Sequence, residues 1–255
     1  MRVLNISVLF NVSTWFTIKR IVVLDNTLKS ATVLSVENTW AIVVAAGSGT
    51  RFGSAKQYAN LGGKSVLSRS IATARKSCNG VVLVVRDIAD GSKFGADLLV
   101  QGGATRTESV RRGLAALPID ADIVVIHDAA RPGAPHELFD SVINEVIGGA
   151  DGSVPGLAIA DTVKRVRNQD SGMIVESTVN RVNLVTVQTP QAFGRRIFEA
   201  AYLAYDEKNL DFSDDAGLVE NIGGIVKIIE GDKRAHKITT QEDLIYVAQM
   251  MGFES

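Results

Sequence analysis

Hydrophobic runs of strand length alternate with amphipathic segments of helix length from residue 40 onward. The strand-like runs are rich in β-branched residues and lie at 41–46, 81–86, 122–127, 153–160 and 225–230. Apolar residues recur at helical spacing over 65–78, 106–117, 136–148, 194–206, 214–222 and 240–251. This alternation is typical of an α/β fold, a Rossmann-like, mostly parallel sheet with helices on both faces.

Two of the expected helices begin with the pattern of a capping box. Thr105 is followed three residues later by Glu108, and Thr239 by Glu242. In a capping box the hydroxyl and the carboxylate each bind a backbone N–H that the helix itself leaves unpaired. We therefore expect helices to start at these two threonines.

Residues 160–187 break the alternation. Two β-prone arms flank a polar, glycine-containing turn at 168–172, which is the pattern of a β-hairpin. A two-stranded ribbon is only marginally stable alone. We expect this arm to pack on a second subunit and form a homodimer, with packing on its own sheet as the alternative.

Composition limits the classes of protein to which the chain can belong. With 255 residues, 46% hydrophobic and 22% charged, the segment 40–255 fits a single domain. The net charge of −1 and the 6% of aromatic residues disfavour nucleic-acid binding. A single cysteine, Cys78, excludes an internal disulfide and suits the reducing cytoplasm.

Residues 1–39 precede this pattern. Their apolar runs are short, and polar or charged residues interrupt each of them, so no membrane span is expected. The order of regions in a signal peptide is also missing. We expect an additional β-like or poorly ordered extension of unknown role, with a start site assigned too far upstream as the alternative.

The candidate chemistry begins where the first strand ends. Gly47 and Gly49 follow the apolar run and allow the backbone N–H groups to approach an anion. Arg51 and Lys56 add two positive charges, so the loop is typical of a triphosphate site. Its spacing does not fit a P-loop or a dinucleotide fingerprint. A tight turn with incidental cations is the structural alternative.

Further motifs follow in order along the chain. They are Ala45-Ala-Gly-Ser-Gly-Thr-Arg51, Lys56-Gln57, Gly102-Gly103, Arg106, Ser109, His127-Asp-Ala-Ala-Arg-Pro132, Asp161-Thr-Val-Lys164, Asn180-Arg181, Gln188-Thr-Pro-Gln191, Ser213-Asp-Asp-Ala216 and Lys237-Ile-Thr239. Together they resemble the 2-C-methyl-D-erythritol 4-phosphate cytidylyltransferases of non-mevalonate isoprenoid synthesis, over about residues 40–250.

The resemblance implies a homodimer with a protruding β-arm, and a Mg²⁺-dependent reaction of CTP with a polyol phosphate. It implies catalytic roles for Arg51, Lys56 and Lys237, and a Mg²⁺-binding role for Asp128. The nucleotide would be bound by Ala45, Ala46, Gly47, Gly49, Gly103, Ala104 and Ser109. The polyol phosphate would be bound by Arg131 and Thr189, and by Thr162 and Arg181 of the neighbouring subunit's arm.

Other interpretations stay open at this point. A ribitol 5-phosphate cytidylyltransferase would share the mechanism, although the paired alanines at 129 and 130 favour the isoprenoid family. A non-catalytic nucleotide-binding module is the alternative from another class. The acidic pair Asp214 and Asp215 begins a predicted helix, where carboxylates favour the helix dipole, so we do not expect a second metal site there.

Overall fold

The structure is a computed structural model that describes residues 37–170, 172–208, 212 and 214–253. The predicted extension therefore lies outside the described residues, except for its last three. From Asn38 onward the chain forms one compact unit. Its first strand already begins at Thr39.

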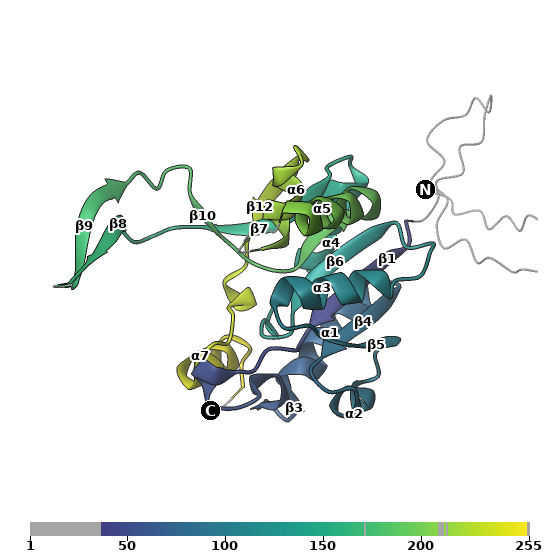
Figure 1. Cartoon of the computed structure of the whole chain (residues 1–255). Helices are drawn as coiled ribbons and strands as arrows, with labels where there is room; N and C mark the ends of the chain where they lie inside the picture. Colours follow the sequence, from purple (N-terminus) through teal and green to yellow (C-terminus); the bar gives the residue numbers. More distant parts are fainter. Residues whose placement is uncertain (1–36, 171, 209–211, 213, 254–255) are drawn as a thin grey trace, which may run out of the picture. The chain divides into compact units, whose positions relative to one another are not determined.

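A mostly parallel sheet of eight strands is the centre of this unit (Figure 1). The strand order is β10–β7–β11–β6–β1–β4–β5, with β12 paired to β7. Only β10 and β11 run antiparallel to their neighbours. The bounds are β1 Thr39–Val44, β4 Gly80–Val85, β5 Leu98–Gln101, β6 Ile123–Asp128, β7 Gly152–Ala158, β10 Val185–Val187, β11 Gln191–Gly194 and β12 Val226–Glu230.

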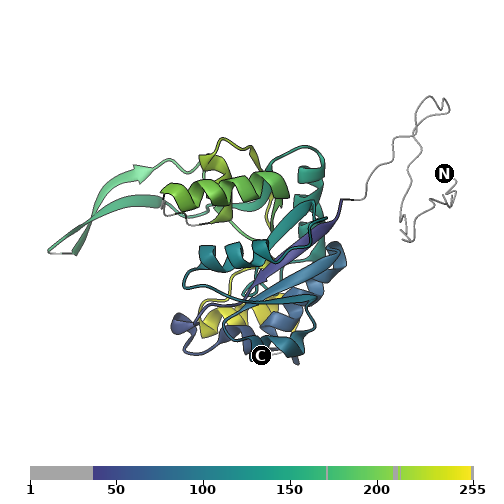
Figure 2. The same cartoon turned by 45° about the vertical axis from the view of Figure 1, so that its right-hand side comes forward.

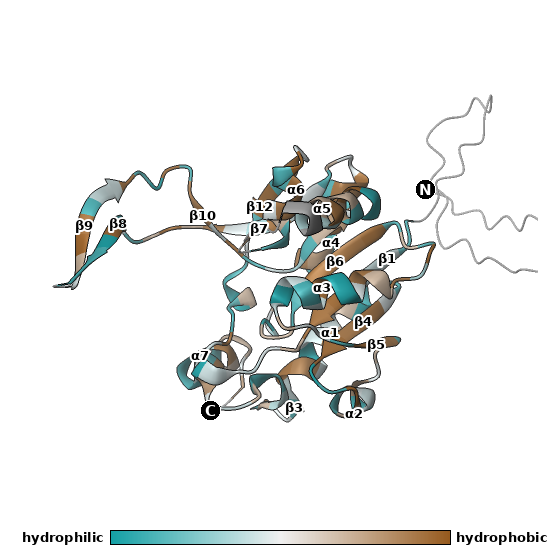
Figure 3. Cartoon of the chain, in the orientation of Figure 1, coloured by the Kyte–Doolittle hydropathy of each residue, from teal (hydrophilic) through white to brown (hydrophobic). Residues whose placement is uncertain are grey.

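Helices cover both faces of the sheet, as the alternating pattern predicted. Successive strand residues point to opposite faces, so Val43 packs with α1 and α4 while Ile42 packs with α3, α5 and α6. The central strands are accordingly hydrophobic along their length (Figure 3). The helices are α1 Val66–Ser77, α2 Ile88–Gly91, α3 Arg106–Ala115, α4 His136–Ile147, α5 Arg195–Lys208, α6 Asp215–Asn221 and α7 Gln241–Met250.

Every strand and helix predicted outside the arm is present, with ends within two residues of the prediction. The short strands β5, β10 and β11, the small hairpin of β2 Asn60–Leu61 and β3 Lys64–Ser65, and the one-turn α2 were not predicted. The predicted cap at Thr239 was wrong by one residue. Thr240 caps α7, in a capping box with Asp243. Thr105 caps α3 as predicted, but the Glu108 carboxylate pairs with Arg111 and Arg112 and does not complete the predicted capping box.

The predicted hairpin is present and forms a sheet of its own. Strands β8 Val163–Gln169 and β9 Gly172–Val179 pair only with each other among the described strands. In both views they extend away from the main sheet (Figure 1 and Figure 2). The predicted range of 160–187 was too long, because β10 has already returned to the main sheet and pairs with β7.

Candidate active site

The carboxyl ends of β1, β4, β5 and β6 meet at one edge of the sheet, where ligands bind in folds of this kind. A cleft of about 440 Å³ lies at this edge. It is lined by residues of the loops that follow β1 and β5, by the end of β6 and by a lysine before α7. The predicted site residues among its walls are Ala45, Ala46, Gly47, Lys56, Gly103, Ala104, Ser109, Asp128 and Lys237.

The glycine-rich loop after β1 turns sharply at Gly49. This residue has a φ of 68°, and a Cβ there would overlap the carbonyl oxygen of Ser54. Only glycine tolerates both the positive φ and the close approach of the Ser54 carbonyl oxygen. The turn leads into a short 3₁₀ helix, Thr50–Phe52, on which Arg51 is exposed. Gly49 shapes the loop and Arg51 follows it, but neither residue lines the cleft in this structure.

Two lysines far apart in the sequence meet at the segment before α7. The Lys56 Nζ donates to the carbonyl of Ile238 (2.7 Å), and the Lys237 Nζ lies 2.6 Å from Asp128 Oδ2. Burial lowers the pKa of Lys56, and the neighbouring charge of Lys237 lowers it further. The segment thus brings two cations to the same wall of the cleft.

Asp128 is the last residue of β6, and both of its carboxylate oxygens are paired. Arg106 Nε donates to Oδ1 (3.1 Å), and Lys237 contacts Oδ2. Burial by itself would raise the pKa of Asp128, but the two cations together hold it well below its usual range. The carboxylate therefore stays ionised although it is only 7% exposed.

A second cleft of about 430 Å³ adjoins the first. The two clefts share Arg106, Asp128 and Lys237 as a common wall. The other residues around the second cleft are Arg131, Val187, Gln188, Thr189, Gln191, Asp214 and Glu220. Two neighbouring compartments with cations between them can hold two anionic groups next to each other.

The family model described as 2-C-methyl-D-erythritol 4-phosphate cytidylyltransferase matches residues 39–252. The chain belongs to this family. A protein of that name from Frankia casuarinae is 39% identical over 220 residues, which cover 83% of this chain and 80% of the relative. The crystal structure of 4-diphosphocytidyl-2C-methyl-D-erythritol synthase from Anaerococcus prevotii has a TM-score of 0.73 and 31% identity, covering 85% of this chain and 99% of that one.

A bifunctional relative is longer than this chain. The IspD/IspF enzyme of Clavibacter michiganensis is 42% identical over 218 residues, but these cover 80% of this chain and only 52% of the relative. The chain thus spans about half the length of this curated relative. Within the part of the chain that the structure describes, no helix is long and apolar enough to cross a membrane.

Arg131 and Thr189, the two substrate residues predicted within one chain, both lie at the second cleft. The Arg131 Nη1 donates to the carbonyl of Ala235 (2.8 Å), and burial lowers its pKa. The Thr189 hydroxyl accepts the backbone N–H of Asp128 (3.0 Å) and lies 3.2 Å from Nδ1 of His127. Thr189 therefore also supports the end of β6 that carries Asp128.

Thr162 and Arg181, predicted to act from a neighbouring subunit, lie at the base of the hairpin, and neither lines either of the two clefts described above. The Arg181 guanidinium donates to the carbonyls of Ile159 and Ala160. Thr162 is exposed. A single chain therefore does not bring these two residues to the site.

Two residues for which the sequence predicted no role in the site, Arg106 and Asp215, lie at the site or directly behind it. Arg106 belongs to the motif set, yet its position in the wall between the clefts follows only from the fold. Asp214, predicted to lie in the first turn of a helix, is the N-cap of α6 and accepts the N–H of Gly217. Asp215 is different, because it is fully buried and paired with Arg106. The Asp-Asp pattern alone did not distinguish the two carboxylates.

Proposed function

We propose that this chain transfers the cytidylyl group of CTP to 2-C-methyl-D-erythritol 4-phosphate. The products would be 4-diphosphocytidyl-2-C-methyl-D-erythritol and pyrophosphate. Membership of the cytidylyltransferase family supports the reaction. The observation that carries the proposal is the pair of adjoining clefts whose common wall is Arg106, Asp128 and Lys237.

The chemistry needs positioned charges more than a proton acceptor. A phosphate oxygen of the polyol phosphate forms a bond to the α-phosphorus of CTP, and the bond from that phosphorus to the bridging oxygen of pyrophosphate breaks. The nucleophile is already an anion. Lys56 and Lys237 would bring the two polyanions together and stabilise the charge that develops at the phosphorus.

The sheet indicates how CTP would lie in the first cleft. The order β6–β1–β4–β5 places Asp128 at one end of the cleft and the loop after β5 at the other. Ser109 supports this loop, since its hydroxyl accepts the N–H of Gly103 (3.1 Å) and donates to the carbonyl of Thr105 (2.8 Å). We place cytosine and ribose at the β5 end and the phosphates between Gly47 and the lysines.

Asp128 fits the Mg²⁺ that we propose as cofactor. It is the one carboxylate among the described residues around the first cleft, and its depressed pKa keeps it ionised. Mg²⁺ is commonly held by one or two carboxylates together with substrate phosphates. No cluster of three His, Cys, Asp or Glu side chains is present in the described part of the chain, so substrate oxygens and water would supply the other ligands. The ion would neutralise phosphate charge in the reaction.

We also propose a homodimer formed through the hairpin. Met173 and Val175 are 74% and 56% exposed, which is unfavourable for apolar side chains unless another surface covers them. Thr162 and Arg181 would then complete the second cleft of the partner. Neither residue has a place at the site of its own chain.

Mixing two inactive variants tests the shared site. Asp128→Asn damages a subunit's own site, and Arg181→Ala damages the site of its partner. After equimolar exchange, half of the dimers are mixed and each keeps one intact site, so about one quarter of wild-type activity returns. Activity that stays at the level of the separate variants would show that Arg181 acts within its own chain or not at all.

The reaction itself is tested by pyrophosphate release from CTP, with methylerythritol phosphate and ribitol 5-phosphate offered separately. We expect release with the first substrate, and its loss when EDTA removes Mg²⁺. Release with ribitol 5-phosphate alone would change the substrate and keep the mechanism. Folded protein that binds CTP and releases no pyrophosphate with either substrate would contradict the proposal.

A further inference from the structure

Two buried side chains lie behind the wall that separates the clefts. Asp215 is 1% exposed and Tyr202 is 3% exposed, and neither lines either cleft. They come from α6 and α5, which cover one face of the sheet. Their positions therefore exclude direct contact with a substrate in the clefts.

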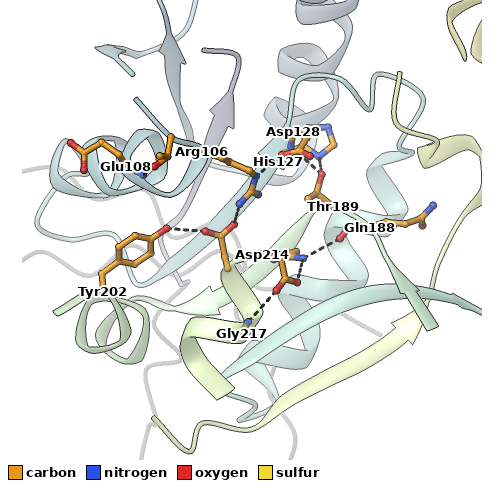
Figure 4. A network of polar contacts seen from close by, with 12 residues as sticks. Arg106, Glu108, His127, Asp128, Gln188, Thr189, Tyr202, Asp214 and Gly217 are labelled. Atoms are coloured by element: carbon orange, nitrogen blue, oxygen red, sulfur yellow. Dashed lines mark hydrogen bonds and ion pairs between the residues drawn. The ribbon is translucent and has the colours of Figure 1, made fainter. Parts of the chain in front are cut away.

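A continuous set of hydrogen bonds joins these residues to Asp128 (Figure 4). The Tyr202 hydroxyl donates to Asp215 Oδ1 (2.8 Å). Arg106 donates through Nη1 to Asp215 Oδ2 (2.7 Å) and through Nε to Asp128 Oδ1 (3.1 Å). The guanidinium is thus shared by one carboxylate at the site and one behind it.

Burial makes this arrangement specific. A buried carboxylate that loses its cation is strongly unfavourable, so Asp215 holds the guanidinium of Arg106 in place. The planar fork of arginine sets the directions of its N–H groups, and contact with Asp215 therefore fixes how Nε faces Asp128. Burial raises the pKa of Tyr202, which keeps the phenol protonated as a donor.

The aromatic residues of α5 hold Tyr202 itself. Its ring packs edge-on against Phe198, with centroids 5.1 Å apart, and lies 6.5 Å from the ring of Tyr205. Phe198 in turn stacks on Phe193 of β11. The hydroxyl of Tyr202 is therefore directed by the packed core and not by solvent.

We propose that Tyr202 and Asp215 are positioning residues for the transfer reaction, acting through Arg106 on the orientation of Asp128. This rests on the function proposed above. Arg106 also lines both clefts, and the contacts with Asp128 and Asp215 use two of the five N–H donors of its guanidinium. Precise alignment of this residue matters at the point where the two substrates meet.

Tyr202→Phe is the first test, because it removes one hydroxyl and keeps the aromatic packing. We expect kcat for pyrophosphate release to fall about tenfold, while KM for CTP stays within about twofold because the walls of the nucleotide cleft are unchanged. Tyr205→Phe is the matched control on the same helix, and we expect wild-type kinetics from it. Unchanged kcat in Tyr202→Phe would overturn the proposal.

A double-mutant cycle separates positioning from general damage to the fold. Arg106→Lys keeps a positive charge but loses the fork that contacts both carboxylates. If Tyr202 acts through Arg106, Tyr202→Phe has an effect of less than about twofold in the Arg106→Lys background. A full tenfold loss in both backgrounds would show that Tyr202 acts independently of Arg106 and would refute the relay.

Asp215→Asn is the stronger perturbation, for which we expect a loss of kcat of about 100-fold. Its kinetics are interpreted only after circular dichroism and thermal unfolding show a folded protein. Wild-type enzyme that fails to release pyrophosphate would contradict the proposed function. Active wild type together with fully active Tyr202→Phe would contradict only the positioning role.

Discussion

The edge of the main sheet and the β8–β9 hairpin hold their predicted site residues in different ways. At the sheet edge Asp128 is nearly buried, and side chains from distant parts of the same chain hold it on both oxygens. On the hairpin, Thr162 is exposed, and Arg181 binds only carbonyls close to it. The contacts that hold Asp128 are thus complete within one chain, whereas Thr162 and Arg181 would contribute to a site only in the proposed dimer.

The largest effect on kcat is expected when Asp128, at the centre of the sheet-edge region, is replaced. Asp128→Asn removes the charge that Arg106 and Lys237 face while it keeps the shape of the side chain. We expect kcat to fall about 1000-fold, as for the loss of a preorganised electrostatic contact. Asp140→Asn, at an exposed position of α4, is the control. An Asp128→Asn activity within tenfold of wild type would contradict the central role of this carboxylate.

In the same region, the buried His127 should make the free energy of unfolding depend on pH. Burial lowers the pKa of His127 to about 4, against about 6.5 in an unfolded chain. The unfolded chain therefore binds an additional proton between these pH values. This contribution to stability is complete above about pH 6.5 and is lost as the pH falls toward 4, by up to about 3 kcal/mol.

Denaturant unfolding at several pH values measures this contribution. We expect the free energy of unfolding of wild type to fall more steeply between pH 6.5 and 4.5 than that of His127→Asn. His136→Asn is the control, because this histidine is on the surface at the start of α4. Parallel pH profiles for wild type and His127→Asn would show that the buried ring does not control this dependence.

A charge placed on the β8–β9 hairpin tests whether this second region forms the proposed dimer interface. Met173→Glu puts a carboxylate on the exposed apolar face of β9, so we expect a weaker dimer and about tenfold lower activity at low protein concentration. The free energy of unfolding of the subunit should not change, because Met173 is 74% exposed. Light scattering and activity are compared with Ile119→Glu, a change at an exposed residue after α3. Equal dissociation of both variants would argue against the hairpin interface.

The two regions also differ in how far the sequence predicts them. The hairpin is local, so its β-prone arms and glycine turn were visible in the sequence. The loop after β1 was also predicted, because its glycines and cations directly follow a strand-like run in the sequence. The role of Asp128 at the end of β6 was implied by the resemblance to the family. The contact of Arg106 with Asp215 joins residues 109 positions apart, and no local pattern indicates it. The strands β5 and β11 have only four residues each, too few for a periodic signal.

The smallest expected effect concerns the start of α7, where two neighbouring threonines and two neighbouring acids fit the same capping pattern. The sequence alone does not distinguish Thr239 with Glu242 from Thr240 with Asp243, and the structure selects the second pair. Asp243 Oδ2 also accepts the N–H of Thr239, which follows the Lys237 and Ile238 segment.

Thr240→Ala should lower the free energy of unfolding by about 1 kcal/mol, the usual value of an N-cap hydroxyl. Thr239→Ala keeps the backbone N–H that Asp243 binds and should have little effect. If Thr239→Ala lowers the free energy of unfolding more than Thr240→Ala, the helix begins one residue earlier than in this structure. Thr239 and Glu242, instead of Thr240 and Asp243, would then hold the start of α7 next to the segment that carries Lys237.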